Sequence, residues 1–271
     1  MTVIVGIICK DSIVLASDSR TTTEGEHLHF RDDAAKISVI ELAAKSGRRP
    51  QALIAQSGHA DLSSRTVEIM ERMAKDTPLN GYRAVADLAE AAVRELRDQV
   101  FGNLPLTSEE AVRQHYDKYG FNLMIVHFFD GKPYLFTVAF EYGVAVWKRG
   151  LNLVTLGCGG PLAEFLLKPF DLASMDTPLA TTAAVYAIEA VKGFDPRCGG
   201  KTQTGAAFIA PDNSNQASLA DWENLRFFVD EVESLVGAAK DDWTRIMKTV
   251  LERASTKWAA RTKKMGDVQP Q

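Results

Sequence analysis

The chain alternates between two kinds of hydrophobic pattern, and the order of these patterns restricts its fold more than any other feature. Alternating apolar positions with many β-branched residues predict strands at residues 2–8, 13–17, 52–56, 122–129, 134–139, 144–148, 153–156 and 205–210. Apolar residues at helical spacing predict helices at residues 61–75, 82–101, 161–168 and 179–191. This order predicts an α+β fold in which helices cover the outer faces of two stacked antiparallel sheets.

The composition agrees with this fold and argues against several classes of protein. A chain of 271 residues, with 46% hydrophobic and 24% charged residues, can bury a full core. A formal net charge of −4 gives no bias toward nucleic acid or an anionic membrane, so we expect neither as a partner. No apolar run approaches the roughly 20 residues of a membrane span, and no signal segment precedes Thr2.

The cysteine and histidine residues give no pattern of a metal site. Cys9, Cys158 and Cys198 are an odd number without CxxC spacing, which predicts neither a disulfide framework nor a zinc knuckle and favours a reducing cytoplasm. His27 and His29 form a His-x-His pair without a third ligand in pattern, so we interpret them as loop residues. We therefore expect a cytoplasmic protein with no metal or other cofactor.

The last part of the chain, residues 225–271, has a pattern of its own. Apolar residues recur at intervals of three and four between Trp243 and Trp258, with basic residues between them. This spacing predicts an amphipathic helix with a basic outer face. Such a helix can pack on its own subunit or on a neighbouring one, and the sequence leaves both interpretations open.

Thr2 is the first candidate for chemistry. Removal of Met1 would leave Thr2 with a free α-amine beside its own hydroxyl. A threonine hydroxyl is a weak nucleophile, but an amine with a pKa of roughly 7.7–8.0 can accept its proton. On position alone Thr2 could equally be the first residue of a strand, so its role depends on the motifs that follow.

Several short motifs follow in order. The strand that starts at Thr2 turns at Lys10-Asp11, its partner ends at Asp18-Ser19-Arg20, and Lys36-Ile37 opens a third strand. The remaining motifs are loops, with the sequences Gln56-Ser57-Gly58-His59-Ala60-Asp61, Gly157-Cys158-Gly159 and Asp195-Pro196-Arg197-Cys198-Gly199-Gly200. Together they resemble the proteasome β-type and HslV-like subunits of the N-terminal nucleophile (Ntn) hydrolase family.

The resemblance implies a fold, an activity and a branch of the family. The implied fold is a four-layer αββα sandwich over residues 1–224, with residues 225–271 as a helical extension. The implied activity is that of a threonine endopeptidase subunit in a self-compartmentalised ring. The length beyond residue 224 favours a bacterial proteasome homologue, of the Anbu or the betaproteobacterial proteasome homologue type, over the shorter HslV pattern.

The resemblance also assigns the catalytic roles. Thr2 would attack the scissile carbonyl, Lys36 would keep the threonine amine unprotonated, and Asp18 would be the counter-charge of Lys36. The backbone N–H of Gly58 would stabilise the oxyanion.

A second implied group, made of Asp195 and the residues at 158 and 198, would surround the threonine amine. Cys158 and Cys198 stand where the resemblance leads us to expect serines. Since a thiol is a weaker hydrogen-bonding group than a hydroxyl, this departure puts proton relay around the amine in question.

The substrate-binding residues are also carried over from the resemblance. They would hold the substrate as an added strand and line the first specificity pocket, and they are Thr21, Thr22, Ala34, Ser38, Gln56 and Ala60. Two alanines and a glutamine predict an uncharged pocket of middle size for small or medium apolar side chains.

The partners follow from the same reading. The substrates would be polypeptides, and an unselective peptidase would need its sites enclosed. We therefore expect a homo-oligomeric ring, stacked as a double ring, with Thr2 facing an inner chamber. The resemblance allows an ATPase unfoldase as a further partner without requiring one.

Three alternatives stay open. Cys158 and Cys198 suggest an inactive, structural ring subunit. A different Ntn amidohydrolase that acts on a small amide is a second alternative. A cysteine nucleophile is the third, and it would need a histidine nearby, for which His59 is the candidate beside a motif.

Overall fold

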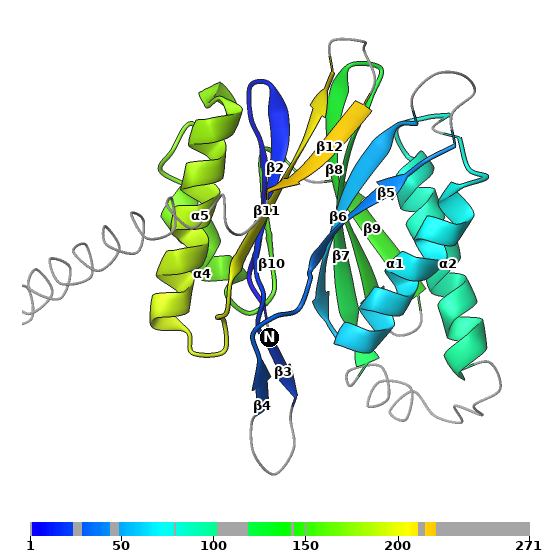
Figure 1. The fold of residues 1–271 in the computed structure, drawn as a ribbon, viewed down its shortest axis with the longest axis horizontal. Coiled ribbons are helices and arrows are strands. Elements are labelled where there is room, and N and C mark those ends of the chain that lie inside the picture. Colours follow the sequence, from blue (N-terminus) through cyan, green and yellow to red (C-terminus); the bar gives the residue numbers. More distant parts are fainter. Residues whose placement is uncertain are drawn as a thin grey trace, which may run out of the picture.

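The computed structural model describes residues 2–23, 29–43, 49–78, 80–101, 119–141, 144–149, 151–210 and 215–220. Within these residues two five-stranded antiparallel sheets stack on each other, and a pair of helices covers each outer face (Figure 1). This arrangement confirms the predicted α+β fold with two stacked antiparallel sheets. The expected domain boundary at residue 224 and the helical extension 225–271 lie outside the described residues.

The first sheet is built from both ends of the described chain. Its strands, in spatial order, are β10 (Leu153–Leu156), β1 (Ile4–Ile8), β2 (Ser12–Asp18), β11 (Thr202–Ile209) and β12 (Asn215–Ala220). Helices α4 (Gly160–Leu167) and α5 (Thr177–Phe194) cover its outer face, and the short 3-10 helix η1 (Leu172–Ser174) joins them (Figure 1).

The second sheet comes from the middle of the chain. Its strands are β5 (Ile37–Glu41), β6 (Gln51–Gly58), β7 (Phe121–Phe129), β8 (Lys132–Glu141) and β9 (Val144–Arg149). Helices α1 (Ala60–Ala74) and α2 (Ala84–Phe101) pack on it. A separate hairpin of β3 (Thr21–Thr23) and β4 (His29–Arg31) extends away from the sandwich near Thr2 (Figure 1).

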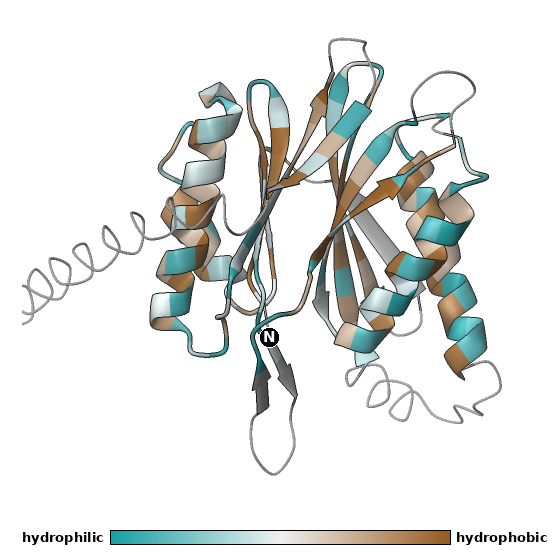
Figure 2. Ribbon diagram, in the orientation of Figure 1, coloured by the Kyte–Doolittle hydropathy of each residue, from teal (hydrophilic) through white to brown (hydrophobic). Residues whose placement is uncertain are grey.

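Strand β2 shows why alternation alone describes this fold incompletely. All seven of its residues are buried, so no solvent-facing set exists. Ile13 and Leu15 belong to the core between the two sheets, while Val14 and Ala16 belong to the core under α4 and α5. Both faces of this strand are therefore covered, and Figure 2 shows apolar residues in brown along strands of both sheets.

The two sheets approach each other closely at Gly6. A Cβ at this position would lie 2.6 Å from Met124 Sδ and 2.8 Å from Leu135 Cδ1, both on the second sheet. A Cβ at this position would force Met124 and Leu135 to shift, so glycine suits the close contact of the two sheets beside β1.

Several elements differ from their predicted bounds for local reasons. Helix α5 starts at Thr177 rather than at 179, because the Asp176 carboxylate accepts a hydrogen bond from the N–H of Leu179 at 3.0 Å. Strand β11 starts at Thr202, and the sequence did not indicate β12 or the β3–β4 hairpin. Short polar strands lack the apolar alternation that reveals a strand in sequence. Among the described helices, none has the length and apolar character needed to cross a membrane.

Candidate active site

Thr2 lies two residues before the start of β1, at the end of the first sheet nearest the β3–β4 hairpin (Figure 1). It is 5% exposed. Its carbonyl oxygen accepts hydrogen bonds from the N–H of Gly159 at 3.3 Å and from the Cys158 thiol at 3.6 Å. Gly157 has φ +83°, and a Cβ there would lie 2.0 Å from the Thr2 carbonyl oxygen. The loop after β10 therefore fixes the backbone of Thr2.

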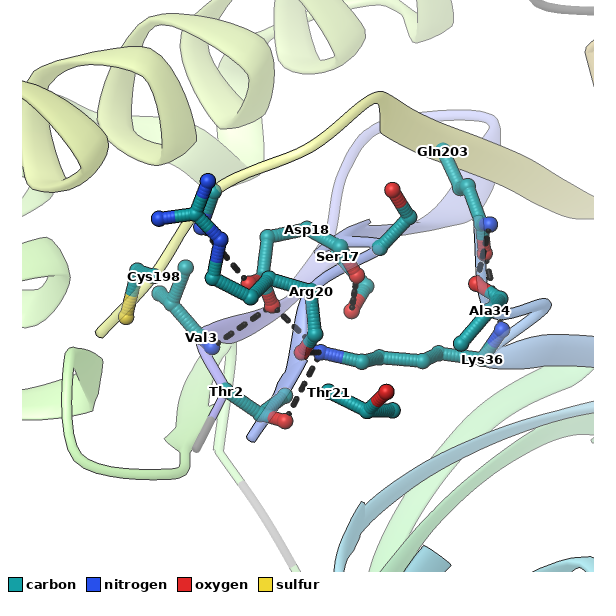
Figure 3. A network of polar contacts seen from close by, with 12 residues as sticks. Thr2, Val3, Ser17, Asp18, Arg20, Thr21, Ala34, Lys36, Cys198 and Gln203 are labelled. Carbon is teal, nitrogen blue, oxygen red and sulfur yellow. Dashed lines mark hydrogen bonds and ion pairs between the residues drawn. The ribbon is translucent and has the colours of Figure 1, made fainter. Parts of the chain in front are cut away.

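The Lys36 ammonium is the centre of the polar network beside Thr2. Lys36 directly precedes β5, and its Nζ donates to Thr2 Oγ1 at 2.8 Å and to Asp18 Oδ1 at 2.9 Å. It also donates to the carbonyl oxygen of Arg20 at 2.5 Å, as Figure 3 shows. An ammonium has three donors, so this one is fully satisfied and its position is fixed from three sides.

Asp18 holds Lys36 and ties two distant segments together. It ends β2 and is fully buried. Its Oδ1 also accepts the N–H of Val3 at 3.0 Å, and its Oδ2 accepts the N–H of Gly199 at 3.0 Å. These bonds replace the water that a buried carboxylate loses, so the charge is compensated by one cation and two backbone donors.

Burial controls the electrostatics of this pair. Desolvation lowers the pKa of Lys36 from its ordinary value, and the charge and hydrogen bond of Asp18 act against that shift. Breaking such a buried pair from one side typically costs about 3–5 kcal/mol of stability, because the other charge is left uncompensated.

The segment before Lys36 is positioned by a residue that the sequence did not indicate. Gln203 of β11 donates from Nε2 to the carbonyl oxygen of Ala34 at 2.7 Å and accepts from the N–H of Lys36 at 2.9 Å (Figure 3). A glutamine in a β-rich stretch has no sequence signal of its own. Its role appears only when β11 pairs with β2, which places Gln203 opposite Ser17.

Arg20 and Ser19 shape the same wall of the site. Arg20 forms a two-point pair with Asp32, with Nε–Oδ1 at 2.6 Å and Nη2–Oδ2 at 2.8 Å, and donates to the carbonyl oxygen of Pro196 at 2.8 Å. Ser19 Oγ donates to the carbonyl oxygen of Asp32 at 2.5 Å and accepts from the N–H of Lys201 at 2.7 Å. Both residues follow Asp18 directly in the motif at the end of β2, which was the signal available.

The second predicted group, Cys158, Asp195 and Cys198, also meets in space. One ligand-type atom from each residue lies within 4.8 Å of the other two, and the two sulfur atoms are 3.8 Å apart. Cys158 is exposed, whereas Cys198 is 1% exposed. The Asp195 carboxylate pairs with Arg197 at 2.8 Å through both oxygens, and this hydrogen bonding lowers the pKa of Asp195. A metal ion here would have to compete with the Arg197 guanidinium for that carboxylate.

The pKa values of the two thiols are shifted in opposite directions. Their shared hydrogen bond lowers the pKa of Cys158 to about 6 and raises the pKa of Cys198. The thiolate, where it forms, is therefore on the exposed Cys158. Burial also raises the pKa of Cys198, which keeps its thiol protonated.

Gly58, the predicted oxyanion donor, is a glycine for steric and conformational reasons. It ends β6 with φ +96°, and a Cβ would lie 2.6 Å from both the Gly120 carbonyl oxygen and Phe121 Cα. These contacts account for the glycine without any catalytic role. Its participation in an oxyanion hole stays a prediction.

His59 has a structural task in the same loop. Its Nδ1 accepts from the N–H of Leu62 at 3.4 Å, so His59 is the N-cap of α1. This use of the ring gives no support to a cysteine–histidine pair. His27 and the side chain of His29 lie outside the described part of the chain.

The predicted substrate-binding residues are placed on four elements. Thr21 and Thr22 are in β3, Ser38 is in β5, Gln56 is in β6 and Ala60 begins α1, while Ala34 lies between β4 and β5. Gln56 donates to the carbonyl oxygen of Ala35 at 3.2 Å and accepts from Ser64 Oγ at 3.4 Å. The side chain of Thr22 is outside the described part, and the role of this whole set stays a prediction.

The layer order of helices, sheet, sheet and helices is the sandwich of Ntn hydrolases. No protein-family model matches the chain, and no curated protein matches it. Among solved structures, a Gly-1 mutant of Anbu from Hyphomicrobium sp. strain MC1 is 15% identical with a TM-score of 0.62, over 89% of this chain and 97% of that one. The helical assembly of the Anbu complex from Pseudomonas aeruginosa gives 14% and 0.63, over 93% and 96%.

A third structure, Anbu (ancestral beta-subunit) from Yersinia bercovieri, gives the same picture. It is 14% identical with a TM-score of 0.61, over 88% of this chain and 96% of that one. These likenesses establish that the chain has the fold of these Anbu proteins along nearly all of their length.

Proposed function

We propose that this chain is a threonine-type endopeptidase subunit of a proteasome-like ring, in which Thr2 is the nucleophile once Met1 has been removed. The observation that carries the proposal is the 2.8 Å hydrogen bond from Lys36 Nζ to Thr2 Oγ1. A buried ion pair is weak evidence for a stabilising role, because apolar residues of similar volume often stabilise a protein as well or better. Chemistry at Thr2 accounts for a buried lysine that donates to the threonine hydroxyl.

The proposed reaction uses the threonine twice. The α-amine of Thr2 takes the proton of Oγ1, directly or through one water, and Oγ1 attacks the carbonyl carbon of the peptide bond. The C–N bond then breaks, the departing amine takes the proton, and an acyl ester remains on Thr2. Water hydrolyses this ester and restores the hydroxyl.

Lys36 has two electrostatic tasks in this scheme. As a cation close to Thr2, it disfavours a second positive charge on the α-amine and so keeps that amine available as a base. As a donor to Oγ1, it favours the negative charge that develops on this oxygen during attack. The proposed donor to the oxyanion of the substrate is the N–H of Gly58.

We propose polypeptides as substrates, held as an added strand beside β3 with the first side chain in a pocket near Ala34, Gln56 and Ala60. None of the predicted substrate-binding residues carries a charge. Both polar ends of Gln56 are already engaged, which leaves a weakly polar surface. Small or medium apolar side chains at the cleaved position fit such a lining.

The proposed ring would use exposed apolar side chains on one pair of helices. Helices α4 and α5 carry exposed large apolar residues, including Phe165 at 71% and Leu179 at 53% exposure. Contiguous exposed apolar surface is typical of a subunit contact, and we propose that these side chains contribute to one. One of the structures with this fold is itself described as a helical assembly. We propose a closed homo-oligomeric ring, stacked as a pair, with an ATPase unfoldase as an optional partner. Light scattering that finds a fully active monomer would contradict it.

An inactive structural subunit is the second candidate, and the thiols favour it. Cys158 and Cys198 replace expected serines with weaker hydrogen-bonding groups, and Asp195 is paired with Arg197. In that case the buried Lys36 would serve folding alone.

Intact mass after treatment with an epoxyketone or β-lactone that reacts with N-terminal threonine separates the two candidates. An active subunit should have lost Met1 and should gain one adduct, mapped to Thr2. The Thr2→Ala variant is the control and should gain none. A wild-type chain that has lost Met1 and still gains no adduct would favour the structural subunit.

A further inference from the structure

Cys158 and Cys198 form a thiol pair across two loops that both end at the candidate site. Cys158 lies in the loop between β10 and α4, and Cys198 lies in the loop between α5 and β11. Their sulfur atoms are 3.8 Å apart, in direct contact. Cys9 is the third cysteine, and its thiol contacts Ser12 Oγ at 3.0 Å.

We propose that Cys158 and Cys198 are a peroxide-responsive pair that closes to a reversible disulfide beside Thr2. The pair is asymmetric in the way that such a reaction needs. Cys158 is exposed and can meet a small oxidant, whereas Cys198 is 1% exposed and is held by the hydrogen bond from its own N–H to the carbonyl oxygen of Asp195 at 3.0 Å. The exposed thiol lies at the surface, and the buried thiol lies 3.8 Å from it.

The chemistry proceeds in two balanced steps with hydrogen peroxide as the oxidant. The Cys158 thiolate attacks one peroxide oxygen, so that an S–O bond forms, the O–O bond breaks, and hydroxide leaves and takes a proton to become water. Cys198 sulfur then attacks the sulfur of the Cys158 sulfenic acid. The S–S bond forms, the S–O bond breaks, and the leaving hydroxide takes the Cys198 proton as water.

The titration of the two thiols agrees with this division of roles. The lowered pKa of Cys158, about 6, makes this residue the nucleophile at neutral pH. Cys198, whose pKa is raised, stays a thiol until the sulfenic acid forms next to it. A dithiol such as dithiothreitol reverses the reaction by exchange.

Closure would act on Thr2 through the loop that holds it. The two sulfur atoms would move from 3.8 Å to about 2.05 Å apart, which draws together the two loops that carry them. Gly157 packs so tightly on the Thr2 carbonyl that its loop cannot shift without moving Thr2. If the proposed peptidase function holds, a displacement near 1 Å would slow turnover on the order of 100-fold.

The test combines peptide mapping with activity on the full-length chain. Reduced protein is treated with stoichiometric hydrogen peroxide, digested under non-reducing conditions and analysed by mass spectrometry. We expect a Cys158–Cys198 linked peptide that is two hydrogens lighter than its parts and that dithiothreitol abolishes. The Cys9→Ser variant is the matched control, and it should form the same link to the same extent.

Two further variants identify the order of the steps. Cys198→Ser should accumulate a sulfenic acid on Cys158 that dimedone traps, and Cys158→Ser should give neither link nor trapped acid. A sulfenic acid trapped on Cys198 in Cys158→Ser, or oxidation of wild-type Cys158 to sulfinic acid without any link, would overturn the proposal.

The activity readout separates this inference from the proposed function. A link that forms while turnover falls on the order of 100-fold and returns with dithiothreitol supports both. A link in a chain that never hydrolyses peptide refutes the peptidase and leaves the thiol pair standing. Reversible linkage that leaves turnover unchanged refutes the effect on Thr2.

Discussion

The two pairs that flank Thr2 differ in almost every physical respect. On the hydroxyl side, the Lys36–Asp18 pair has side chains that are 5% and 0% exposed, carries opposite charges and has every ammonium donor satisfied. On the carbonyl side, the Cys158–Cys198 pair is half accessible and held by one weak thiol contact.

This difference separates what a site must keep constant from what it can change. The charged pair is fixed by backbone donors from residues far apart in the chain, so any loss of one partner leaves an uncompensated charge. The thiol pair has little to lose structurally, because a buried cysteine behaves as a small apolar residue. Mutations on the two sides should therefore have effects of different size and kind.

The largest effect is expected from Thr2 itself, on which both pairs converge. Thr2→Ala removes the proposed nucleophile and should lower peptide turnover by a factor on the order of 10⁶, as loss of a lone nucleophile does. The fold should persist, since the side chain makes its described hydrogen bond only to Lys36. Turnover is measured with a fluorogenic peptide, and unchanged turnover would end the mechanism.

The charged side should show the next largest effect. Lys36→Ala should cost about 3–5 kcal/mol of unfolding free energy, because Asp18 stays buried without its cation. It should also slow turnover about 10²- to 10⁴-fold, because the α-amine is no longer kept in its basic form. Lys36→Arg should not restore activity, since a planar guanidinium does not replace a compact ammonium.

A partly buried lysine provides the control for that variant. Lys192 pairs with Glu189 at 2.7 Å and donates to Thr202 Oγ1 at 2.6 Å, and it makes no described contact with Thr2. Lys192→Ala should lower the free energy of unfolding in a denaturant titration and leave turnover of the folded protein near wild type. Equal losses of turnover in both variants would mean that Lys36 acts through stability alone.

A smaller effect is expected on the carbonyl side, where the loop meets Thr2. Gly157→Ala places a methyl group 2.0 Å from the Thr2 carbonyl oxygen and should reduce turnover by displacing it, on the order of 100-fold for a shift near 1 Å. Gly131→Ala is the matched control, since Gly131 also has a positive φ, +69°, but nothing lies within 4 Å of its added Cβ. Both should lose about 1–2 kcal/mol from backbone strain. Similar turnover in the two would contradict a tight fit at Gly157.

The smallest expected effect is the pH dependence that comes from the Cys158 thiol. The rate at which iodoacetamide alkylates Cys158 should rise with a midpoint near pH 6, because its thiolate forms there. The sign for stability follows from the same shift. The lowered pKa of Cys158 contributes stability that is present above the ordinary thiol pKa and is lost as the pH falls through about 6. A midpoint near the ordinary thiol pKa of 9.0 would show that Cys198 donates no hydrogen bond to Cys158.

The sequence contained most of the layer order and the residues nearest Thr2. Helical spacing located α1, α2, α4 and α5, since each has one apolar stripe. The motifs at Asp18 and Lys36 located a pair that the fold brings to 2.9 Å. These features are local, so they leave a pattern along the chain.

Other parts of the site depend on pairing between distant strands and leave no such pattern. Gln203 acts on Ala34 and Lys36 only through the register of β11 against β2. The second oxygen of Asp18 is satisfied by the N–H of Gly199, and a backbone donor has no residue type to recognise. The sequence also did not indicate the two-point ion pair between Asp195 and Arg197, although the two residues stand in one motif.

The pairing of β11 with β2 has a consequence for the synthesis of the protein. Thr2, Asp18 and Lys36 leave the ribosome long before Gly199 and Gln203, yet they become fully fixed only when those two residues dock. A nascent chain therefore carries its proposed nucleophile in an unfinished setting for most of its translation. The proposed active site is therefore complete only after the rest of the chain has folded around it.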